Sequence, residues 1–387
     1  MKRRALLAAL GTGLAGCSSS AGTGTTDRQT TRARTNRETT RSTTTETTEP
    51  TATEPGTETT TAEPAADTVD VGVVYIPFAG DKFGKCTTVS HPEVGTYGDP
   101  IPQGVSSQHA AWLADAGVST VMFNFGESRK DYDRLRTFLQ ADLGPLSVEP
   151  FYVISQALRR DRDIEADFAF LRETLLSTDR CHRRNGRPVV TFWDFDFLAW
   201  GGSEDSKEAK ALVEEYGGPA GFVAYLREQL TVGGTEPFLV GDFYDHAVGG
   251  FSDDYAELNR HLDGATNWIT AFGADVTGEW PAARDRVAES FAATRSFCDE
   301  HDMAYHPMAF PGFDDRHNSC WGSGRYIPRA PAHLRELLEL AREYSTGRVN
   351  VASFNDWTEG HQIEPGRFRG TAYGTDYLDV VAEFTGT

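Results

Sequence analysis

The stretch Val349-Asn-Val-Ala-Ser-Phe354 is a short, mostly apolar run rich in residues that favour strands. Seven similar runs precede it in the chain, at residues 69–76, 119–125, 147–154, 188–193, 237–243, 266–272 and 303–308. Most of these runs lack a polar alternate face, which is typical of parallel strands that are buried on both sides. The sequence therefore predicts a buried parallel sheet of eight strands.

Stretches with helical patterning lie between these runs. They cover residues 106–116, 130–141, 164–176, 219–230, 254–261, 283–298 and 332–344, and a last helix is expected at 377–384. Eight strands separated by helices predict an α/β fold, a single (β/α)8 TIM barrel, because eight is the number at which such a barrel closes. A doubly wound open sheet is the alternative, but no Gly-rich nucleotide-binding loop follows the first run.

The first 17 residues are typical of an export signal. Lys2, Arg3 and Arg4 precede a short apolar run that ends in Leu14-Ala-Gly-Cys17. This pattern predicts a lipoprotein signal in which Cys17 is lipidated, and the adjacent arginines favour the twin-arginine export route. We therefore expect an exported, cell-surface protein that is lipid-anchored to the outer face of the cytoplasmic membrane. The alternative is an apolar N-terminus that arose by chance, with Cys17 as a structural cysteine.

Residues 18–66 differ from the rest of the chain in composition. They are almost entirely Thr, Ser, Glu, Pro, Gly and Arg, without an aromatic residue, so they cannot bury enough apolar surface to offset chain entropy. We expect a disordered stalk, either O-glycosylated or a bare flexible spacer. Residues 67–387 are long enough for one large domain.

The formal net charge is −20, with 57 Asp and Glu against 37 Lys and Arg. Such a surface repels phosphate backbones, so nucleic acid is not expected as a partner. Lysine is scarce, which is typical of proteins from high-salt organisms, where salt screens the self-repulsion of acidic surfaces. A moderately acidic secreted protein is the alternative. We expect a monomer.

Four cysteines remain after Cys17, at positions 86, 181, 298 and 320. In an exported protein they can pair. Cys86 and Cys320 both lie in loops that follow predicted strands, and therefore on one face of the barrel, so we expect a disulfide between them. Four free thiols are the alternative.

The active face of a (β/α)8 barrel is built from the C-terminal strand ends and the loops that follow them. The polar residues at these positions are Tyr75, Asn124, Glu127, Gln156, Asp194, Asp196, Asp242, Asp245 and His246, together with the loops 311–325 and 355–364. Aromatic residues lie among them, namely Trp193, Trp200, Phe243, Tyr244, Trp280, Trp321 and Trp357. Sugar rings stack on aromatic faces and glycosidic cleavage uses paired carboxylates, so this composition favours a carbohydrate ligand.

Residues 351–366, V-A-S-F-N-D-W-T-E-G-H-Q-I-E-P-G, leave the last run and carry three carboxylates. The segment resembles the signature of glycoside hydrolase family 99 and its relatives, which is approximately S-[FY]-N-E-W-H-E-G-T-Q-I-E-P at the same place in a (β/α)8 barrel. Asp356, Thr358 and His361 differ from that signature, and the other positions match.

A second segment supports the resemblance. Pro311-Gly-Phe-Asp-Asp315 is similar to the P-G-[FY]-D-D loop that follows the seventh strand in that family, and Gly324-Arg-Tyr326 lies where the family often has G-G-x-Y. The strand order resembles that of the family over most of residues 69–366, whereas the motifs match only in these last two loops.

The resemblance implies an endo-acting hydrolase of α-linked glycans, typically α-mannosides, that retains the anomeric configuration. In that family one carboxylate deprotonates the 2-hydroxyl of the sugar, which attacks the anomeric carbon, and the other protonates the leaving oxygen. Carried over, Asp356 is the base and Glu359 the acid/base. Asp356 is one methylene shorter than the glutamate of the family, and a misplacement of about 1 Å can cost about 100-fold in rate.

The other candidates are given binding roles. We expect substrate contacts from Tyr75, Asn124, Trp193, Asp194, Asp242, Tyr244, Asp314, Asp315, Trp321, Arg325, Asn355, Trp357 and Glu364.

Several alternatives stay open for the carboxylates. Asp356 and Glu359 could instead cap a helix or pair with Arg367 or Arg369, and Asp194 and Asp196 could supply the acid, as many sugar-cleaving barrels place it after the fourth strand.

We expect no metal and no organic cofactor, because His246 and His306 show no two-histidine ligand spacing. The segment from Glu127 to Asp131 is expected to be a solvated helix start.

Two other functions compete with hydrolysis. A carbohydrate-binding surface protein that has lost turnover is motivated by Asp356, and a role in polysaccharide assembly is motivated by barrel relatives that occur beside glycosyltransferases. The absence of a nucleotide-binding loop from an exported chain argues against assembly.

Overall fold

The computed structural model describes residues 69–86, 90–244, 252–271 and 278–387, all within the compact unit Ala66–Thr387. The expectations for the signal with Cys17, for the stalk at 18–66, and for Asp245 and His246 lie outside the described residues.

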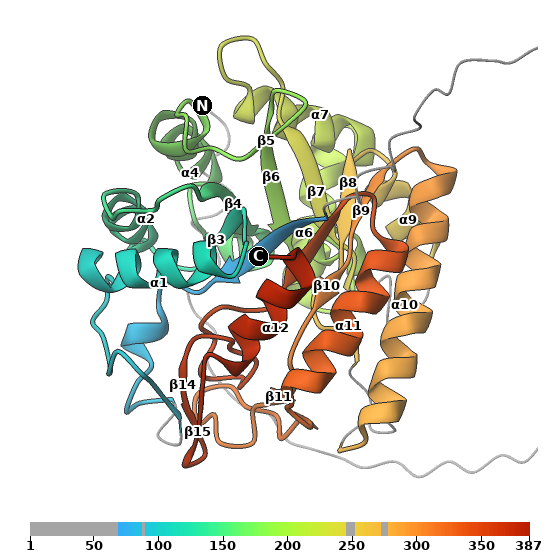
Figure 1. Cartoon of the computed structure of the whole chain (residues 1–387). Helices are drawn as coiled ribbons and strands as arrows, with labels where there is room; N and C mark the ends of the chain where they lie inside the picture. Colours follow the sequence, from blue (N-terminus) through green and yellow to red (C-terminus); the bar gives the residue numbers. More distant parts are fainter. Residues whose placement is uncertain (1–68, 87–89, 245–251, 272–277) are drawn as a thin grey trace, which may run out of the picture. The chain divides into compact units, whose positions relative to one another are not determined.

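One sheet of parallel strands forms the centre of this unit (Figure 1). Along the sheet the order is β10, β13, β1, β3, β4, β6, β7, β8 and β9. The bounds are β1 Asp70–Tyr75, β3 Thr120–Phe125, β4 Ser147–Val153, β6 Arg187–Trp193, β7 Phe238–Asp242, β8 Gly264–Thr266, β9 Ala304–His306, β10 Met308–Ala309 and β13 Arg348–Val351.

The two ends of this order meet. Only Pro307 separates β9 from β10. It interrupts the strand because proline has no N–H to donate to the ladder of hydrogen bonds. This interrupted strand pairs with β8 through β9 and with β13 through β10. The sheet is therefore a nearly closed parallel barrel with eight strand positions, which confirms the predicted α/β barrel.

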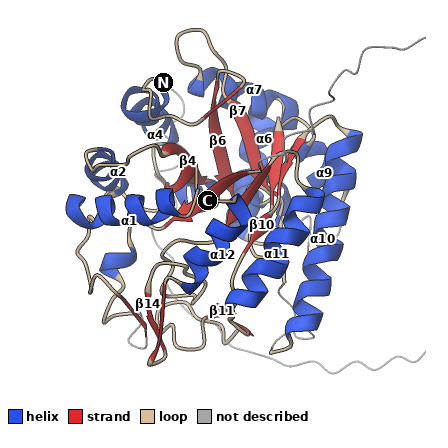
Figure 2. Ribbon diagram, viewed as in Figure 1, coloured by secondary structure: helices blue, strands red, loops and turns tan. Residues whose placement is uncertain are grey.

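Helices surround the strands (Figure 2). Those of the described residues are α1 Gln103–Asp115, α2 Asp131–Leu139, α3 Ile154–Arg159, α4 Ile164–Leu171, α5 Phe197–Trp200, α6 Glu204–Glu215, α7 Gly218–Leu230, α9 Asp253–Asn259, α10 Trp280–Glu300, α11 Pro331–Tyr344 and α12 Asp376–Thr385. A π-helical turn, Arg172–Leu176, extends α4. None of these helices is long and apolar enough to cross a membrane.

Local sequence signals explain where the helices start and which face they bury. Helix α11 begins with Pro331, whose fixed φ suits a first turn, and it buries Leu334, Leu337 and Leu338 at helical spacing. Helix α6 was not predicted. It starts at a capping box in which Ser203 and Ser206 bond reciprocally, and a serine in place of the usual Glu or Gln hid that signal.

Three strand predictions were wrong in extent, one of them at the last strand, where β13 ends at Val351 and not at Phe354. The sixth strand was expected at 266–272, but β8 ends at Thr266. Ile269 and Ala271 are apolar and buried, but they lie in the segment that follows the strand. Hydrophobicity alone therefore did not show where the strand ends and the loop begins. The seventh strand, expected to be continuous over 303–308, is interrupted at Pro307.

Short strands that were not predicted lie at the end of the barrel where β13 finishes. The strands β14 Gly366–Phe368 and β15 Thr371–Gly374 form an antiparallel sheet with β2 Ser90–Pro92. A second antiparallel pair joins β11 Phe313–Asp314 to β12 Tyr326–Ile327. Figure 1 shows β11, β14 and β15 together at this end, which we call the mouth.

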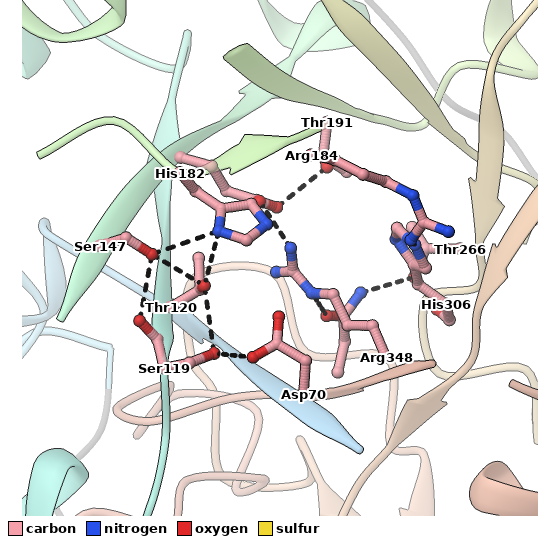
Figure 3. A network of polar contacts seen from close by, with 12 residues as sticks. Asp70, Ser119, Thr120, Ser147, His182, Arg184, Thr191, Thr266, His306 and Arg348 are labelled. Atoms are coloured by element: carbon pink, nitrogen blue, oxygen red, sulfur yellow. Dashed lines mark hydrogen bonds and ion pairs between the residues drawn. The ribbon is translucent and has the colours of Figure 1, made fainter. Parts of the chain in front are cut away.

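A buried polar network fills the opposite end of the barrel, which we call the floor (Figure 3). The guanidinium of Arg348 pairs with Glu149 at 2.8 Å and donates to Asn350 at 2.9 Å. Glu149 also accepts from Thr191 of β6, at 3.1 Å. Gly72 leaves room for the guanidinium, since a Cβ at residue 72 would lie 2.2 Å from Arg348 Nη2. The floor thus cross-links β4, β6 and β13 through charge-assisted bonds.

Two histidines in the floor are held in the neutral form. Burial, followed by the nearby Arg348 and Arg184, lowers the pKa of His306 well below its usual value, and Arg184 donates to His306 Nε2 at 2.9 Å. Burial and Arg348 also lower the pKa of His182. The carboxylates Glu149 and Asp70 oppose that effect but do not outweigh it.

We expect acid to destabilise the fold through these histidines. Below about pH 6.5 the unfolded chain takes up protons that the folded floor excludes, at a cost of up to about 1.4 kcal/mol per pH unit for each histidine. The variant H306Q, whose amide oxygen can still accept from Arg184, should lose less stability than the wild type between about pH 6.5 and pH 5. Urea unfolding across this range measures the difference.

The control for this prediction is H91Q, because His91 is exposed on β2. It should follow the wild type at every pH. An equally steep acid loss in H306Q and in the wild type would contradict the role of His306.

Candidate active site

Asn355 ties the end of the last strand to the end of the first. Its Oδ1 accepts from the backbone N–H of Ile76 at 2.7 Å, and its Nδ2 donates to the carbonyl of Ile76 at 3.1 Å. The side chain is fully buried and satisfied by backbone. Asn355 therefore holds the loop of residues 355–364, called the β13 loop below, instead of contacting substrate as predicted.

Glu364 closes the other end of the β13 loop. Its carboxylate is fully buried and accepts from Trp357 Nε1 at 2.7 Å and from Tyr97 Oη at 2.9 Å. His109 Nε2 lies 2.9 Å from the second oxygen. The predicted substrate contacts of Trp357 and Glu364 are therefore corrected, because both side chains are used inside the protein.

Asp356 is fixed by its own turn. Its Oδ1 accepts from the backbone N–H groups of Thr358 and Glu359, each at 3.0 Å, and from the hydroxyl of Thr358 at 2.6 Å. Burial raises the pKa of Asp356, but His361 and these hydrogen bonds outweigh burial, so the pKa is lowered from its usual value. The carboxylate is therefore held ionised at the mouth.

Glu359 lies beside Asp356 and is held by the loop after β10. Trp321 Nε1 donates to Glu359 Oε1 at 3.0 Å, and Arg325 Nη2 lies 3.9 Å from the same oxygen. The carbonyl of Glu359 accepts from the backbone N–H of Asp314 at 2.8 Å. Trp321 and Arg325, both predicted, thus contact the candidate acid directly.

His361 lies behind both carboxylates and was not predicted. Its Nε2 is 3.6 Å from Asp356 Oδ2 and 3.5 Å from Glu359 Oε2, and the side chain is fully buried. Burial lowers the pKa of His361, but the two carboxylates outweigh burial and raise the pKa to about 9. The only signal in the sequence was that residue 361 departs from the family signature.

Asp314 and Asp315 are anchors of the loop after β10. Asp314 pairs with Arg316 and Arg369, at 2.8 and 3.1 Å, which together lower its pKa although burial raises it. Asp315 accepts from Ser323 and Arg325. Both side chains are buried, so the prediction that they contact substrate is corrected to a role in shaping the loop.

The predicted disulfide between Cys86 and Cys320 is present. It joins the loop after β1 to the loop that carries Trp321, next to the hydrogen bond that Ser319 makes to the carbonyl of Lys85. Cys181 and Cys298 are buried free thiols. The disulfide thus fixes the segment that supplies the indole donor to Glu359.

Aromatic and amide side chains face the interior below the mouth. Asn124 and Trp193 have the strand parity of the floor residues Thr120 and Thr191, so they point into the barrel. Asn124 Oδ1 and Trp193 Nε1 are buried without a hydrogen-bond partner among the described residues. Both predicted residues therefore offer polar groups to a ligand.

Trp268 extends this surface and was missed, because it lies in the segment mistaken for a strand. Its ring packs edge-on against Trp193 and against His361, at centroid distances of 5.9 and 5.4 Å. It thereby connects the aromatic wall to the carboxylates.

Two residues that were predicted to contact substrate, Tyr75 and Asp242, do not offer their side chains to the interior of the mouth. Tyr75 points outward to the helices, where its hydroxyl lies 2.9 Å from His109 Nδ1 and its ring packs on Phe138. Asp242 is fully buried and accepts from the backbone N–H groups of Trp268 and Asp194. Burial raises the pKa of Asp242 well above its usual value.

Three further candidates follow β6 and β7 in the chain. Asp194 is partly buried and adopts a left-handed backbone conformation with φ of 55°, which an aspartate tolerates. Asp196, a rival for the acid, is fully buried and accepts from Asn259 at 2.6 Å. Tyr244 is partly buried. Of the two rivals, only Asp194 remains partly accessible.

Glu127 is a candidate that the sequence reasoning set aside as a solvated helix start. Burial raises its pKa to about 7, and the negative charges of Asp131 and Asp356 act in the same direction. Glu127 is therefore not the fully solvated residue that the sequence predicted.

Comparison with known proteins supports the resemblance in sequence. No family model matches the chain. A segment of 86 residues is 33% identical to the rat glycoprotein endo-alpha-1,2-mannosidase, over 22% of this chain and 18% of that protein. A segment of 77 residues is 30% identical to the zebrafish glycoprotein endo-alpha-1,2-mannosidase-like protein, over 20% and 17%. The match thus spans less than a fifth of these relatives.

The solved structures agree in fold. A family 99 endo-alpha-mannosidase from Bacteroides thetaiotaomicron, in complex with BIS-TRIS-propane, superposes with a TM-score of 0.57 at 16% identity, over 82% of this chain and 96% of that one. A glycoside hydrolase-like protein gives a TM-score of 0.57 at 15% identity, over 83% and 94%. The chain is therefore similar to glycoside hydrolase family 99 endo-α-mannosidases, in the fold of its barrel and in part of its sequence.

Proposed function

We propose that this chain is a glycoside hydrolase that cleaves an α-mannosidic linkage within a glycan and retains the anomeric configuration. The observation that carries the proposal is the pair Asp356 and Glu359, which present carboxylates side by side at the mouth of a barrel similar to family 99. Relatives that match part of the chain are named endo-alpha-1,2-mannosidases.

The two carboxylates have unequal surroundings, which suits unequal roles. Asp356 has a lowered pKa and stays ionised, as a base must. Glu359 is more accessible, with 16% of its side chain exposed against 10% for Asp356. It can therefore reach a leaving oxygen at the mouth, which suits the acid/base.

The proposed reaction takes two steps. In the first, Asp356 removes the proton of the sugar 2-hydroxyl, O2 bonds to C1, and the glycosidic bond breaks as Glu359 protonates the leaving oxygen. In the second, water attacks C1 and gives its proton to Glu359, while O2 leaves C1 and recovers its proton from Asp356. Two inversions at C1 give net retention.

The separation of the carboxylates supports this class of mechanism. The ligand-capable atoms of Asp356, Glu359 and His361 all lie within 4.8 Å of one another. Inverting glycosidases need about 6.5–9.5 Å between their carboxyl groups, because a water molecule stands between them and the sugar. One oxygen of each carboxylate lies nearer to the other than that range, which is in keeping with a mechanism that places no water between them.

The interior wall suits a sugar. Trp193 and Trp268 offer aromatic surface, and Asn124 Oδ1 together with Trp193 Nε1 offers a hydrogen-bond acceptor and a donor. Sugar hydroxyls can satisfy both polar groups, while the ring packs on the indoles.

We further propose that the enzyme works outside the cell. The support is the N-terminal sequence, in which a basic start and a short apolar run precede Cys17 and a Thr-rich stalk. A lipid at Cys17 would tether the barrel to the membrane while the stalk gives it reach.

We expect D356N and E359Q each to lower kcat on α-mannosidic glycans by about 10²–10⁴-fold, because each amide removes one proton-transfer group while keeping the side-chain size. Release of reducing ends from a panel of α-linked glycans is the assay. The matched control E339Q changes an exposed carboxylate on α11 and should leave kcat unchanged.

Unaltered cleavage by both variants would rule out this assignment. Binding of glycans by the wild-type chain, measured by calorimetry without any cleavage, would favour a carbohydrate-binding protein instead.

We expect D356E to be damaging, although it restores the residue of the family signature. The turn that holds Asp356 Oδ1 fits an aspartate, since three donors from Thr358 and Glu359 meet that oxygen. An extra methylene moves the carboxylate by about 1 Å, which should lower kcat about 100-fold. The same assay measures this, and a kcat equal to or above the wild-type value would show that the turn does not constrain the base.

A further inference from the structure

Three side chains at the mouth, Asp356, Glu359 and His361, bring one atom each within 4.8 Å of one another. Asp356 Oδ1 is occupied by three donors of its own turn, which leaves Oδ2 facing His361 Nε2. Glu359 Oε1 is occupied by Trp321, which leaves Oε2 facing the same nitrogen. The free atoms of the cluster are therefore two carboxylate oxygens and one imidazole nitrogen.

The distances between these atoms are long for hydrogen bonds. His361 Nε2 lies 3.6 Å from Asp356 Oδ2 and 3.5 Å from Glu359 Oε2. An N–H···O bond spans about 2.7–3.2 Å. In a tetrahedral site with metal–ligand distances of about 2.1 Å, neighbouring ligand atoms lie about 3.4 Å apart. The two distances to Nε2 are close to this value, and all three atoms lie within 4.8 Å of one another, so small side-chain rotations bring them onto one ion.

In the described residues, the polar groups nearest to the imidazole are the two carboxylates themselves. Both ring nitrogens of His361 lack a hydrogen-bond partner there, although the side chain is fully buried. Its orientation is set by ring contacts, since Phe313 stacks on it at 5.6 Å and Trp268 packs edge-on at 5.4 Å. A buried nitrogen that is held in place without a hydrogen bond can bind an ion, which then replaces the proton that this nitrogen carries between the two carboxylates.

The cluster opens toward the mouth. His361 is fully buried behind the carboxylates, whereas the Asp356 and Glu359 side chains are 10% and 16% exposed. An ion entering from the mouth meets the carboxylates first, and the more exposed Glu359 side chain can rotate to close around it.

We propose that Asp356 Oδ2, Glu359 Oε2 and His361 Nε2 form a binding site for a divalent transition-metal ion, with Zn²⁺ as the representative ion. Two carboxylate oxygens and an imidazole nitrogen are ligands that Zn²⁺ takes with tetrahedral geometry. Three protein ligands leave the fourth position for water. Mg²⁺ prefers oxygen ligands in an octahedron and does not fit this set.

The consequence for activity rests on the proposed function. An ion bound to Oδ2 and Oε2 occupies both carboxylates that would exchange protons with the sugar, so glycan cleavage stops while the ion is bound. The ion is therefore a reversible inhibitor in this proposal and takes no part in the reaction.

Calorimetric titration of Zn²⁺ into the full chain, after treatment with a chelator, tests the site without any substrate. The expected result is one ion per chain. H361Q should weaken binding at least about 100-fold, because loss of even an outer partner of a ligand costs about 10–100-fold. The control H91Q, which removes an exposed histidine of β2, should bind as the wild type does.

E359Q serves as the second variant, because Glu359 is partly exposed and its change does not disturb the interior. It should also weaken Zn²⁺ binding, and thermal unfolding checks that both variants are folded. Absence of Zn²⁺ binding to the wild type, unchanged binding by folded H361Q and E359Q, or equal binding of Mg²⁺ would each overturn the site.

Glycan cleavage measured with and without Zn²⁺ separates the proposed metal site from the proposed hydrolase activity. Zn²⁺ should abolish glycan cleavage and a chelator should restore it. A chain that binds Zn²⁺ through His361 but cleaves no glycan keeps the metal site and loses the proposed hydrolase. A chain that cleaves glycans at saturating Zn²⁺ loses the proposed inhibition.

Discussion

The buried carboxylate of Glu364 is the interaction on which the mouth depends. A charge without water is costly unless it is paired and hydrogen-bonded, and Glu364 meets Trp357, Tyr97 and His109 within 2.9 Å. These partners come from the β13 loop itself, the segment before α1, and α1. These contacts hold both ends of the segment from Trp357 to Glu364, which follows Asp356 directly and contains Glu359 and His361.

The residues of the β13 loop thus divide into two kinds. Asn355, Trp357 and Glu364 form hydrogen bonds within the protein and hold the loop in place. In Asp356 and Glu359, one oxygen accepts hydrogen bonds from the surrounding loops and the other faces His361. The same division holds in the loop after β10, where Asp315 shapes the turn and Trp321 reaches the site.

Much of the barrel could be predicted from the sequence, because buried parallel strands are apolar on both faces and recur between helices. The limits have physical causes. The run around Ile269 is apolar without being a strand, and the serine capping box of α6 lacks the usual acidic partner. Tyr75 was assigned to the mouth, but when both faces of a strand are buried, the sequence does not tell which face a residue occupies.

The candidate site shows the same contrast. The pair Asp356 and Glu359 was identified from a motif, whereas Trp268 and Glu127 depend on how loops fold. The resemblance gave no role to His361, because the family signature has a threonine at this position.

The disulfide between Cys86 and Cys320 joins residues 234 positions apart. The two thiols come from the loops that follow the first and the seventh strand positions, so they meet only after most of the barrel has assembled. Formation of this disulfide therefore requires that the loop after β1 and the loop that carries Trp321 have come together. A preparation in which these thiols react with an alkylating reagent contains chains that lack this link between the two loops, whatever their helix content.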